Sequence, residues 1–272
     1  DQVIFAGFTH APAEDVARKL LSIVPPGLSH VFYSDSGSTA VEVALKMALG
    51  YWKNRGINRT RIIAMDHAYH GDTVGTMSAG ARGVFNAAYA PLLFDAARIP
   101  FPEPGQERRT LDTLEHHAKG AAALVVEPLI CGAGGMRLYS PEVLRDMADI
   151  CTRHGTLFVA DEVMTGFGRT GAAFASQKFG IVPDMLTFAK GVTSAYLPLG
   201  GIMVREKIAS TFDTRALPCG HTYSGHPMCV AAGLATLRAY KEEKVFERGA
   251  ALEGVLRAGL ANIAEKHRTV GE

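Results

Sequence analysis

Short apolar runs alternate with helix-like segments along this chain, and that alternation limits the possible folds more than any other feature. The apolar runs lie at residues 31–33, 61–65, 121–126, 156–160, 185–188 and 201–204. Their length and composition are typical of buried strands, whereas residues 39–53 and 141–154 repeat apolar side chains at helical spacing. The second of these helices is expected to end at Gly155. The pattern predicts an α/β fold with a mainly parallel central sheet.

Composition and charge narrow the class of protein. Hydrophobic residues make up 47% of the chain and charged residues 20%, which is typical of a globular protein and not of a disordered one. The net charge of +1 provides no long-range field that would gather nucleic acid or an anionic membrane. No apolar run approaches the ~20 residues of a membrane span, and residues 1–10 do not resemble a signal peptide. We therefore expect a cytoplasmic protein without nucleic-acid or membrane partners.

The chain is expected to divide near residue 225. Residues 1–225 carry the strand and helix alternation, and residues 226–272 have the pattern of one or two long helices that lead out of the sheet domain. Residues 101–118 are rich in proline and then in charge, which predicts a surface excursion. The chain opens without methionine in strand-like sequence at residues 1–5. It stops just past a helical pattern, so we expect a piece of a longer protein with a truncated small domain.

Two acidic residues, Asp161 and Glu162, follow the apolar run at 156–160. The carboxyl ends of strands form the edge at which open α/β sheets bind ligands, so this pair is a candidate site. The same pattern describes a nucleotide-hydrolase strand, but the chain has no G-x-x-x-x-G-K-[ST] phosphate loop. A strand that ends in a solvated acidic turn is the remaining alternative.

A G-x-G-x-x-G pattern occupies residues 166–171 and could suggest a dinucleotide site. Such a motif joins a strand directly to a helix and is followed, about 20 residues on, by an acid at the end of the next strand. Here the glycines begin four residues after Glu162, and Asp184 precedes its strand. A turn that shapes the wall of a pocket is the better interpretation.

Lys190 follows the apolar run at 185–188 and so lies at the same predicted sheet edge as Asp161. A desolvated lysine amine is a nucleophile towards carbonyls, which is the requirement of Schiff-base chemistry. A single lysine after a strand is more often a surface charge. A pyridoxal cofactor, however, needs a lysine for its aldehyde and an acid for its ring nitrogen, and Lys190 and Asp161 provide both.

Two further segments have the chemistry of such a site. Residues 34–39 join a strand to a helix and are rich in serine and glycine, so they could bind a phosphate or simply cap the helix. In residues 66–73 the two histidines and Asp72 lack the further ligands of a metal site, and Tyr69 could instead lie flat on an aromatic ring. The four cysteines show no C-x-x-C spacing, and we expect no metal. The polar loop at 220–225 is either a second phosphate contact or a turn.

In their order and spacing these motifs resemble the class III aminotransferases of the fold-type I pyridoxal-phosphate superfamily. The resemblance implies the large domain of that fold, with three layers, and pyridoxal 5'-phosphate as cofactor. It implies that Lys190 forms the Schiff base, Asp161 pairs with the ring nitrogen and Tyr69 stacks on the ring. The other implied cofactor contacts are Ser36, Gly37 and Ser38 at the phosphate, Val163 on the opposite ring face, His70 and Glu127 near the ring, and Thr222 at the phosphate of the neighbouring subunit in a homodimer.

Within the class, residues 8–10, 35–44, 69–73 and 132–136 are similar to the diaminopelargonate aminotransferases of biotin synthesis. This implies transfer of an amino group from S-adenosylmethionine to 8-amino-7-oxononanoate, with Tyr69, Asp72 and Arg169 as candidate substrate contacts. Residues 191–201 and 223–225 are instead similar to omega-aminotransferases, and His226 replaces the usual asparagine. An omega-amino acid:pyruvate aminotransferase, an aminomutase or racemase, a noncatalytic fragment, and lysine as the amino donor remain alternatives.

Overall fold

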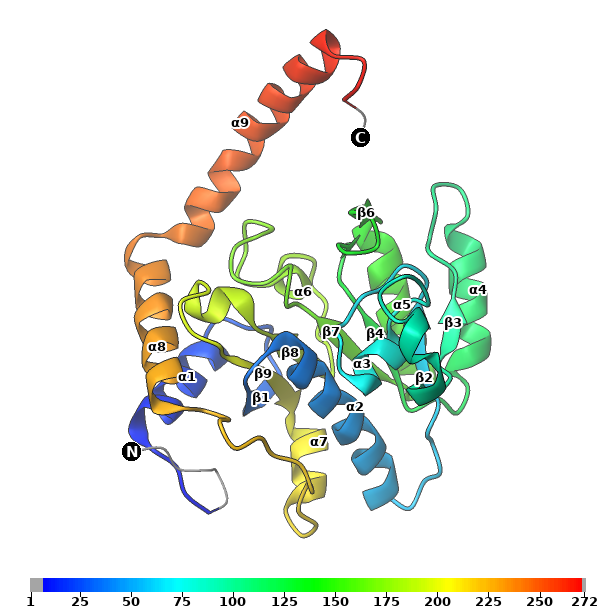
Figure 1. Ribbon diagram of the computed structural model, residues 1–272, viewed down its shortest axis with the longest axis vertical. Helices are drawn as coiled ribbons and strands as arrows, with labels where there is room; N and C mark the ends of the chain where they lie inside the picture. Colours follow the sequence, from blue (N-terminus) through cyan, green and yellow to red (C-terminus); the bar gives the residue numbers. More distant parts are fainter. Residues whose placement is uncertain (1–6, 271–272) are drawn as a thin grey trace.

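In the computed structural model of the protein, the residues whose structure is described are 7–270, and the strand-like pattern at residues 1–5 lies outside this part (Figure 1). A seven-stranded sheet has the order β1-β9-β8-β7-β4-β2-β3. Strands β3, β2, β4, β7 and β8 are parallel to one another, and β9 is antiparallel to its two neighbours, β1 and β8. The strands are β1 (Leu28–Ser34), β2 (Ile62–Met65), β3 (Ala97–Ile99), β4 (Ala123–Val126), β7 (Leu157–Asp161), β8 (Met185–Phe188) and β9 (Gly200–Arg205), with β5 (Ile130–Cys131) and β6 (Arg137–Leu138) in a separate hairpin. The predicted, mainly parallel sheet is confirmed.

Helices cover both faces of the sheet, because successive side chains of each strand point to opposite faces. Ile62 packs towards α2, whereas Ile63 packs towards α4 and α5. Helices α1 and α8 cover the rest of the second face, so the three layers are confirmed (Figure 1). The helices are α1 (Ala11–Leu21), α2 (Gly37–Asn54), α3 (Val74–Ala79), α4 (Glu107–Ala118), α5 (Pro141–His154), α6 (Ala175–Lys178), α7 (Glu206–Ala209), α8 (Pro227–Glu242) and α9 (Val245–Lys266), with 3₁₀ turns η1 (Ala87–Leu92), η2 (Lys190–Thr193) and η3 (Ser210–Phe212).

Helix α5 shows why its bounds could be predicted residue by residue. The Ser140 side chain accepts a hydrogen bond from the Val143 backbone N–H, and Pro141 occupies the first turn. At the other end Gly155 adopts φ 65°, a left-handed conformation that glycine reaches without the steric cost of a Cβ. Local chemistry therefore fixes both ends of this helix.

The surface excursion predicted for residues 101–118 is wrong in its second half, because residues 107–118 form α4. Thr110, Leu114 and Ala118 recur every fourth residue and are buried, and the helix packs against α5. Charged residues occupy most of the other positions, so a narrow buried stripe was hidden by the composition.

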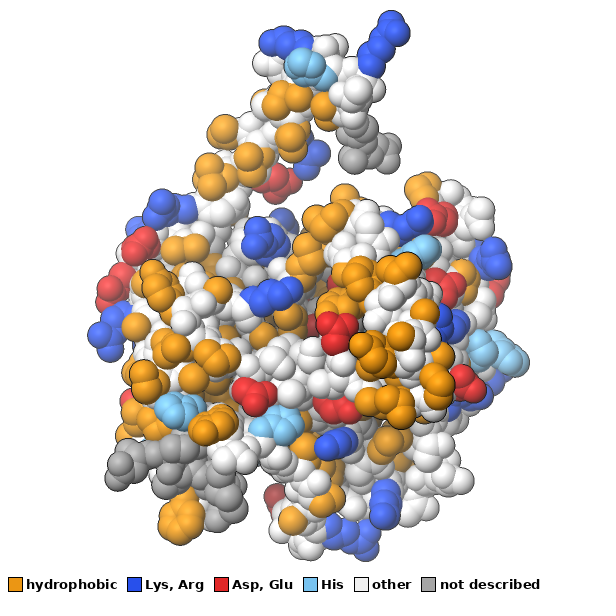
Figure 2. Space-filling view, in the orientation of Figure 1, with side chains coloured by type: hydrophobic (Ala, Val, Ile, Leu, Met, Phe, Trp, Pro, Cys, Tyr) orange, Lys and Arg blue, Asp and Glu red, His pale blue; other side chains and the backbone are white. Residues whose placement is uncertain are grey.

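The C-terminal segment forms two helices after His226, as predicted. Helix α8 packs against α1 and buries Val230 and Leu237, whereas α9 projects from the domain (Figure 1). Figure 2 shows hydrophobic side chains along α9, where Leu252, Val255, Leu256, Leu260 and Ile263 are exposed. The domain boundary at 225 stays a prediction. Among the described helices, none combines the length and the apolarity needed to cross a membrane.

Candidate active site

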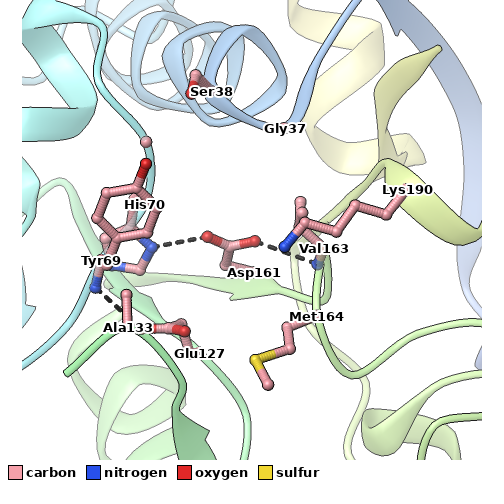
Figure 3. A pocket seen from close by; sticks show the side chains of 11 residues that line it. Gly37, Ser38, Tyr69, His70, Glu127, Ala133, Asp161, Val163, Met164 and Lys190 are labelled. Atoms are coloured by element: carbon pink, nitrogen blue, oxygen red, sulfur yellow. Dashed lines mark hydrogen bonds and ion pairs between the residues drawn. The ribbon is translucent and has the colours of Figure 1, made fainter. Parts of the chain in front are cut away.

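The carboxyl ends of β1, β2, β4, β7 and β8 meet at one edge of the sheet, and a cavity of about 290 Å³ opens there. Its size is close to the lower end of small-molecule sites, at roughly 300 Å³. The sequence-predicted residues that line it are Gly37, Ser38, Tyr69, His70, Glu127, Asp161, Val163 and Lys190 (Figure 3). Gly71, Ala133 and Met164 also line it, although no site role was predicted for them.

Asp161 is buried at the base of this cavity and is held by three donors. Its Oδ2 lies 2.7 Å from His70 Nδ1, and its Oδ1 accepts hydrogen bonds from Thr187 Oγ1 at 3.1 Å and from the Val163 backbone N–H at 3.2 Å. Thr187 lies opposite Asp161 in the β7–β8 ladder. Sequence reasoning missed Thr187, for which a polar residue inside an apolar strand was the available signal. A carboxylate has about four acceptor positions, so one remains for a ligand.

His70 is buried behind Asp161, and its Nε2 has no hydrogen-bond partner among the described residues. Burial by itself would lower the pKa of His70. The hydrogen bond and charge of Asp161, together with the charge of Glu127, outweigh it and raise that pKa above its ordinary value. Within residues 7–270 no group of three or more histidine, cysteine or acidic side chains is arranged to hold a metal ion.

Tyr69 stands at the side of the cavity. Its hydroxyl donates to Asp72 Oδ2 at 2.9 Å, and burial followed by this carboxylate raises the pKa of Tyr69 to about 12. Its backbone N–H donates to Glu127 Oε1 at 2.9 Å, and Glu127 Oε2 accepts from the Gly132 backbone N–H at 3.2 Å. In Figure 3, Tyr69 and Val163 lie on opposite sides of Asp161. A planar ring above Asp161 would therefore have a side chain on each face.

The turn before α2 forms the opposite wall. Ser36 caps the helix by accepting a hydrogen bond from the Thr39 backbone N–H at 3.1 Å, and its side chain does not line the cavity. Gly37 and Ser38 do line it, and first-turn N–H groups have no partner within a helix. A Cβ on Gly37 would lie 2.9 Å from Val163 Cγ1, so glycine is required for this close approach. The turn thus presents backbone donors at a helix N-terminus, which suit a phosphate.

Lys190 reaches into the cavity from the start of η2, with its side chain pointing towards Asp161 (Figure 3). Its φ of 45° lies in the left-handed region, a conformation that costs about 1–3 kcal/mol in a non-glycine residue and is often found at functional sites. The expectation of a buried amine is wrong, because Lys190 is exposed. The physical reason is that Lys190 borders a second cavity of about 640 Å³ as well as the first.

Comparison with known proteins identifies the family. The profile of the family described as aminotransferase class-III matches residues 2–272. The chain belongs to the class III aminotransferases. It is 44% identical, over 97% of its length and 65% of the relative's, to an adenosylmethionine-8-amino-7-oxononanoate aminotransferase from Synechococcus elongatus. It is 36% identical to an omega-aminotransferase from Caulobacter vibrioides, with 96% of this chain and 64% of the relative covered.

A solved structure of an amine transaminase from an uncultivated Pseudomonas species, in a pyridoxal-phosphate-bound form, superposes with a TM-score of 0.92. Its identity to this chain is 33%, and the match covers all of this chain and 66% of the other. The class III aminotransferase described here thus spans less than two thirds of the length of these relatives. The family is pyridoxal-phosphate-dependent, and the open acceptor position on Asp161, the helix N-terminus at Gly37 and the amine of Lys190 fit that cofactor.

The second acid of the predicted pair turns away from the cofactor cavity of this class III aminotransferase. Glu162 is fully buried and accepts hydrogen bonds from Thr165 Oγ1, the Ala175 and Ser176 backbone N–H groups and Ser176 Oγ. Burial raises its pKa, and these donors partly offset that rise. Glu162 therefore caps α6 and stabilises the following segment.

The glycine-rich turn and the remaining predicted residues lie outside the cofactor cavity. A Cβ on Gly168 would lie 3.0 Å from Phe246, and one on Gly171 would lie 3.0 Å from the Cα of Ala250. The start of α9 therefore packs closely against this turn. Arg169 is exposed and borders the larger cavity but not the cofactor cavity. Thr222 and Asp72 are exposed and line neither the cofactor cavity nor the larger one.

Proposed function

We propose that the full-length protein transfers an amino group from S-adenosylmethionine to 8-amino-7-oxononanoate, giving 7,8-diaminononanoate for biotin synthesis. The arrangement of Asp161 and Lys190 in one cavity is the observation that carries the transamination chemistry. The substrates are inferred from the name of the Synechococcus relative, of which this chain spans 65%.

Each cavity residue has a task in this proposal. Pyridoxal phosphate supplies an aldehyde carbon that takes up amino groups and a ring that withdraws electrons. Lys190 Nζ holds the cofactor through that carbon and, once released, moves a proton to and from the substrate carbon. Asp161 accepts a hydrogen bond from the ring nitrogen and keeps it protonated.

Other residues bind and orient. The backbone N–H groups of Gly37 and Ser38, with the turn that Ser36 caps, hold the phosphate. Tyr69 and Val163 pack on the two faces of the ring. His70 holds Asp161, and Glu127 holds the backbone of Tyr69.

Substrate and partner contacts complete the proposal. Asp72, through its hydrogen bond with the Tyr69 hydroxyl, and Arg169, at the edge of the larger cavity, are the proposed substrate contacts. We place Thr222 at the phosphate of the second subunit of a homodimer. Exposed apolar side chains around α3 and η1, among them Val84, Phe85 and Leu92, provide a surface that a second subunit could cover (Figure 2).

A donor and acceptor assay on the purified full-length protein tests the substrate assignment. We expect product formation from 8-amino-7-oxononanoate with S-adenosylmethionine, and lysine is assayed as the alternative donor. Conversion of β-alanine or simple amines with pyruvate, without any use of 8-amino-7-oxononanoate, would rule out the biotin assignment.

The omega-aminotransferase alternative is favoured by a specific observation, the 36% identity to the Caulobacter omega-aminotransferase. It uses the same cofactor residues, so only the assay above separates the two functions. An aminomutase or racemase would turn over a single substrate without an acceptor.

A noncatalytic role predicts that no cofactor binds. We expect the full-length protein to show a visible absorption band from bound pyridoxal phosphate that is lost in Lys190→Ala. Absence of the band in the unsubstituted protein would support the noncatalytic role.

A further inference from the structure

Glu42 lies in the second turn of α2 and reaches across to the start of α3. Its carboxylate accepts three hydrogen bonds: from Thr73 Oγ1 at 3.0 Å, from the Gly75 backbone N–H at 3.2 Å and from the Thr76 backbone N–H at 3.1 Å. Thr73, the residue in the N-cap position of α3, makes no capping bond with its own side chain. Glu42, which belongs to α2, therefore caps α3 in place of the Thr73 side chain. A negative charge is favourable there because the N-terminus of a helix carries a partial positive charge.

The packing around Glu42 leaves little freedom. A Cβ on Gly75 would overlap the Glu42 carboxylate, so this close approach requires glycine at position 75. One turn earlier on α2, Ser38 Oγ accepts a hydrogen bond from the Asp72 backbone N–H at 3.3 Å. A Cβ on Gly71, whose φ is 122°, would overlap that same serine. Ser38 and Glu42, at i and i+4, thus contact the 69–76 segment together.

These contacts connect two halves of the cavity. The N-terminus of α2 provides the proposed phosphate site, and the 69–76 segment carries Tyr69 and His70. Helix α3 has only six residues, which is too short to hold its own position without tertiary contacts. The distance between the phosphate site and Tyr69 therefore depends on how this segment is held on α2, together with the hydrogen bond from the Tyr69 backbone N–H to Glu127.

We propose that Glu42 is a positioning residue: by fixing the 69–76 segment on α2, it places Tyr69 over the cofactor ring at the correct distance from the phosphate site. The proposal rests on the proposed cofactor site. Glu42 does not line the cavity, so its effect is transmitted through the backbone of the segment and not by contact with the cofactor.

The test compares Glu42→Gln with Glu242→Gln in the full-length protein. Both changes convert an acid to an amide, but Glu242 is exposed at the end of α8, outside the cofactor cavity. The Glu42→Gln amide presents an N–H₂ group to backbone donors, so at least one of the three bonds is lost. Hydrogen bonds to a charged group are stronger than those between neutral groups. Because at least one such bond is lost, we expect the dissociation constant of pyridoxal phosphate to rise about tenfold to hundredfold.

Visible-region circular dichroism of the bound cofactor gives the readout that a purely structural role would not change. We expect Glu42→Gln at saturating cofactor to alter this signal and to lower kcat, with Glu242→Gln like the unsubstituted protein. Lower thermal stability of Glu42→Gln with unchanged cofactor affinity and unchanged dichroism would overturn the proposal. Failure of the unsubstituted protein to bind the cofactor would instead refute the proposed function.

Thr73→Val keeps the test decisive if Glu42→Gln does not fold. This change removes one of the three donors and preserves the shape of the side chain. We expect a rise of about threefold to tenfold in the dissociation constant of pyridoxal phosphate, because the single hydrogen bond from the Thr73 hydroxyl is lost. An unchanged dissociation constant and dichroism in Thr73→Val would contradict the positioning role.

Discussion

Asp161 and Glu162 are neighbours in the sequence but end in two different regions of the molecule. Asp161 lies at the base of the cofactor cavity, with three donors and one open acceptor position. Glu162 lies on the other side of the strand end, enclosed by the 165–176 segment with four donors. Two buried carboxylates of similar chemistry thus have different tasks, because only one of them faces a space that a ligand can enter.

The largest expected effect comes from removing the carboxylate that faces the cavity. We expect Asp161→Ala to lower kcat about 10²- to 10⁴-fold, the range typical of groups that govern proton transfer. Steady-state kinetics of the full-length protein measure this change, and Asp149→Ala on the exposed face of α5 is the matched control. Equal rates in the two variants would remove Asp161 from the catalytic site.

Changing the enclosed carboxylate should affect stability and not catalysis. Glu162→Gln leaves one of four buried donors facing an amide N–H₂, and we expect a loss of about 3 kcal/mol in the free energy of unfolding. Urea denaturation measures it. The folded fraction should keep the cofactor affinity of the unsubstituted protein, and a selective loss of that affinity would contradict the separation of the two regions.

On the side of the cavity, the contact of His70 with Asp161 can be tested through the pH dependence of the free energy of unfolding. Since the pKa of His70 is raised in the folded protein, its contribution to stability is fully present below the unfolded value of about 6.5. That contribution is lost as the pH rises through the folded pKa. We therefore expect the stability difference between the cofactor-free protein and His70→Asn to shrink as the pH rises above about 6.5. Denaturation at a series of pH values tests this, and a difference that grows with pH would contradict it.

The smallest effect is expected at the side of the cavity. Tyr69→Phe keeps the ring and loses the hydrogen bond to Asp72, so we expect kcat/KM to fall only about threefold to tenfold. Because the pKa of Tyr69 is about 12, its titration should add no limb to the pH profile of kcat/KM between pH 7 and 10. A limb in that range that disappears in Tyr69→Phe would show that Tyr69 ionises during turnover.

The sequence by itself determined six of the seven strands of the main sheet, β3 (Ala97–Ile99) being missed, together with the ends of α5 and the series of polar residues at the carboxyl edge. These features depend on local periodicity, capping and the alternation of side chains, which a single sequence displays. Resemblance to a family added the cofactor roles that we propose for Lys190 and Asp161. Alternation also predicts that Asp161 and Glu162 point to opposite sides, but not which of them faces the ligand.

Tertiary structure alone decided the rest. The contact of His70 with Asp161 joins residues 91 apart, and that of Glu42 with Thr73 joins residues 31 apart. No local pattern encodes such a pairing, because it depends on how the strands are ordered in the sheet and how α2 packs on the face of that sheet. The same packing left Lys190 exposed between two cavities, whereas the Ser36 cap is a local contact with Thr39 that the sequence had left as one of two interpretations.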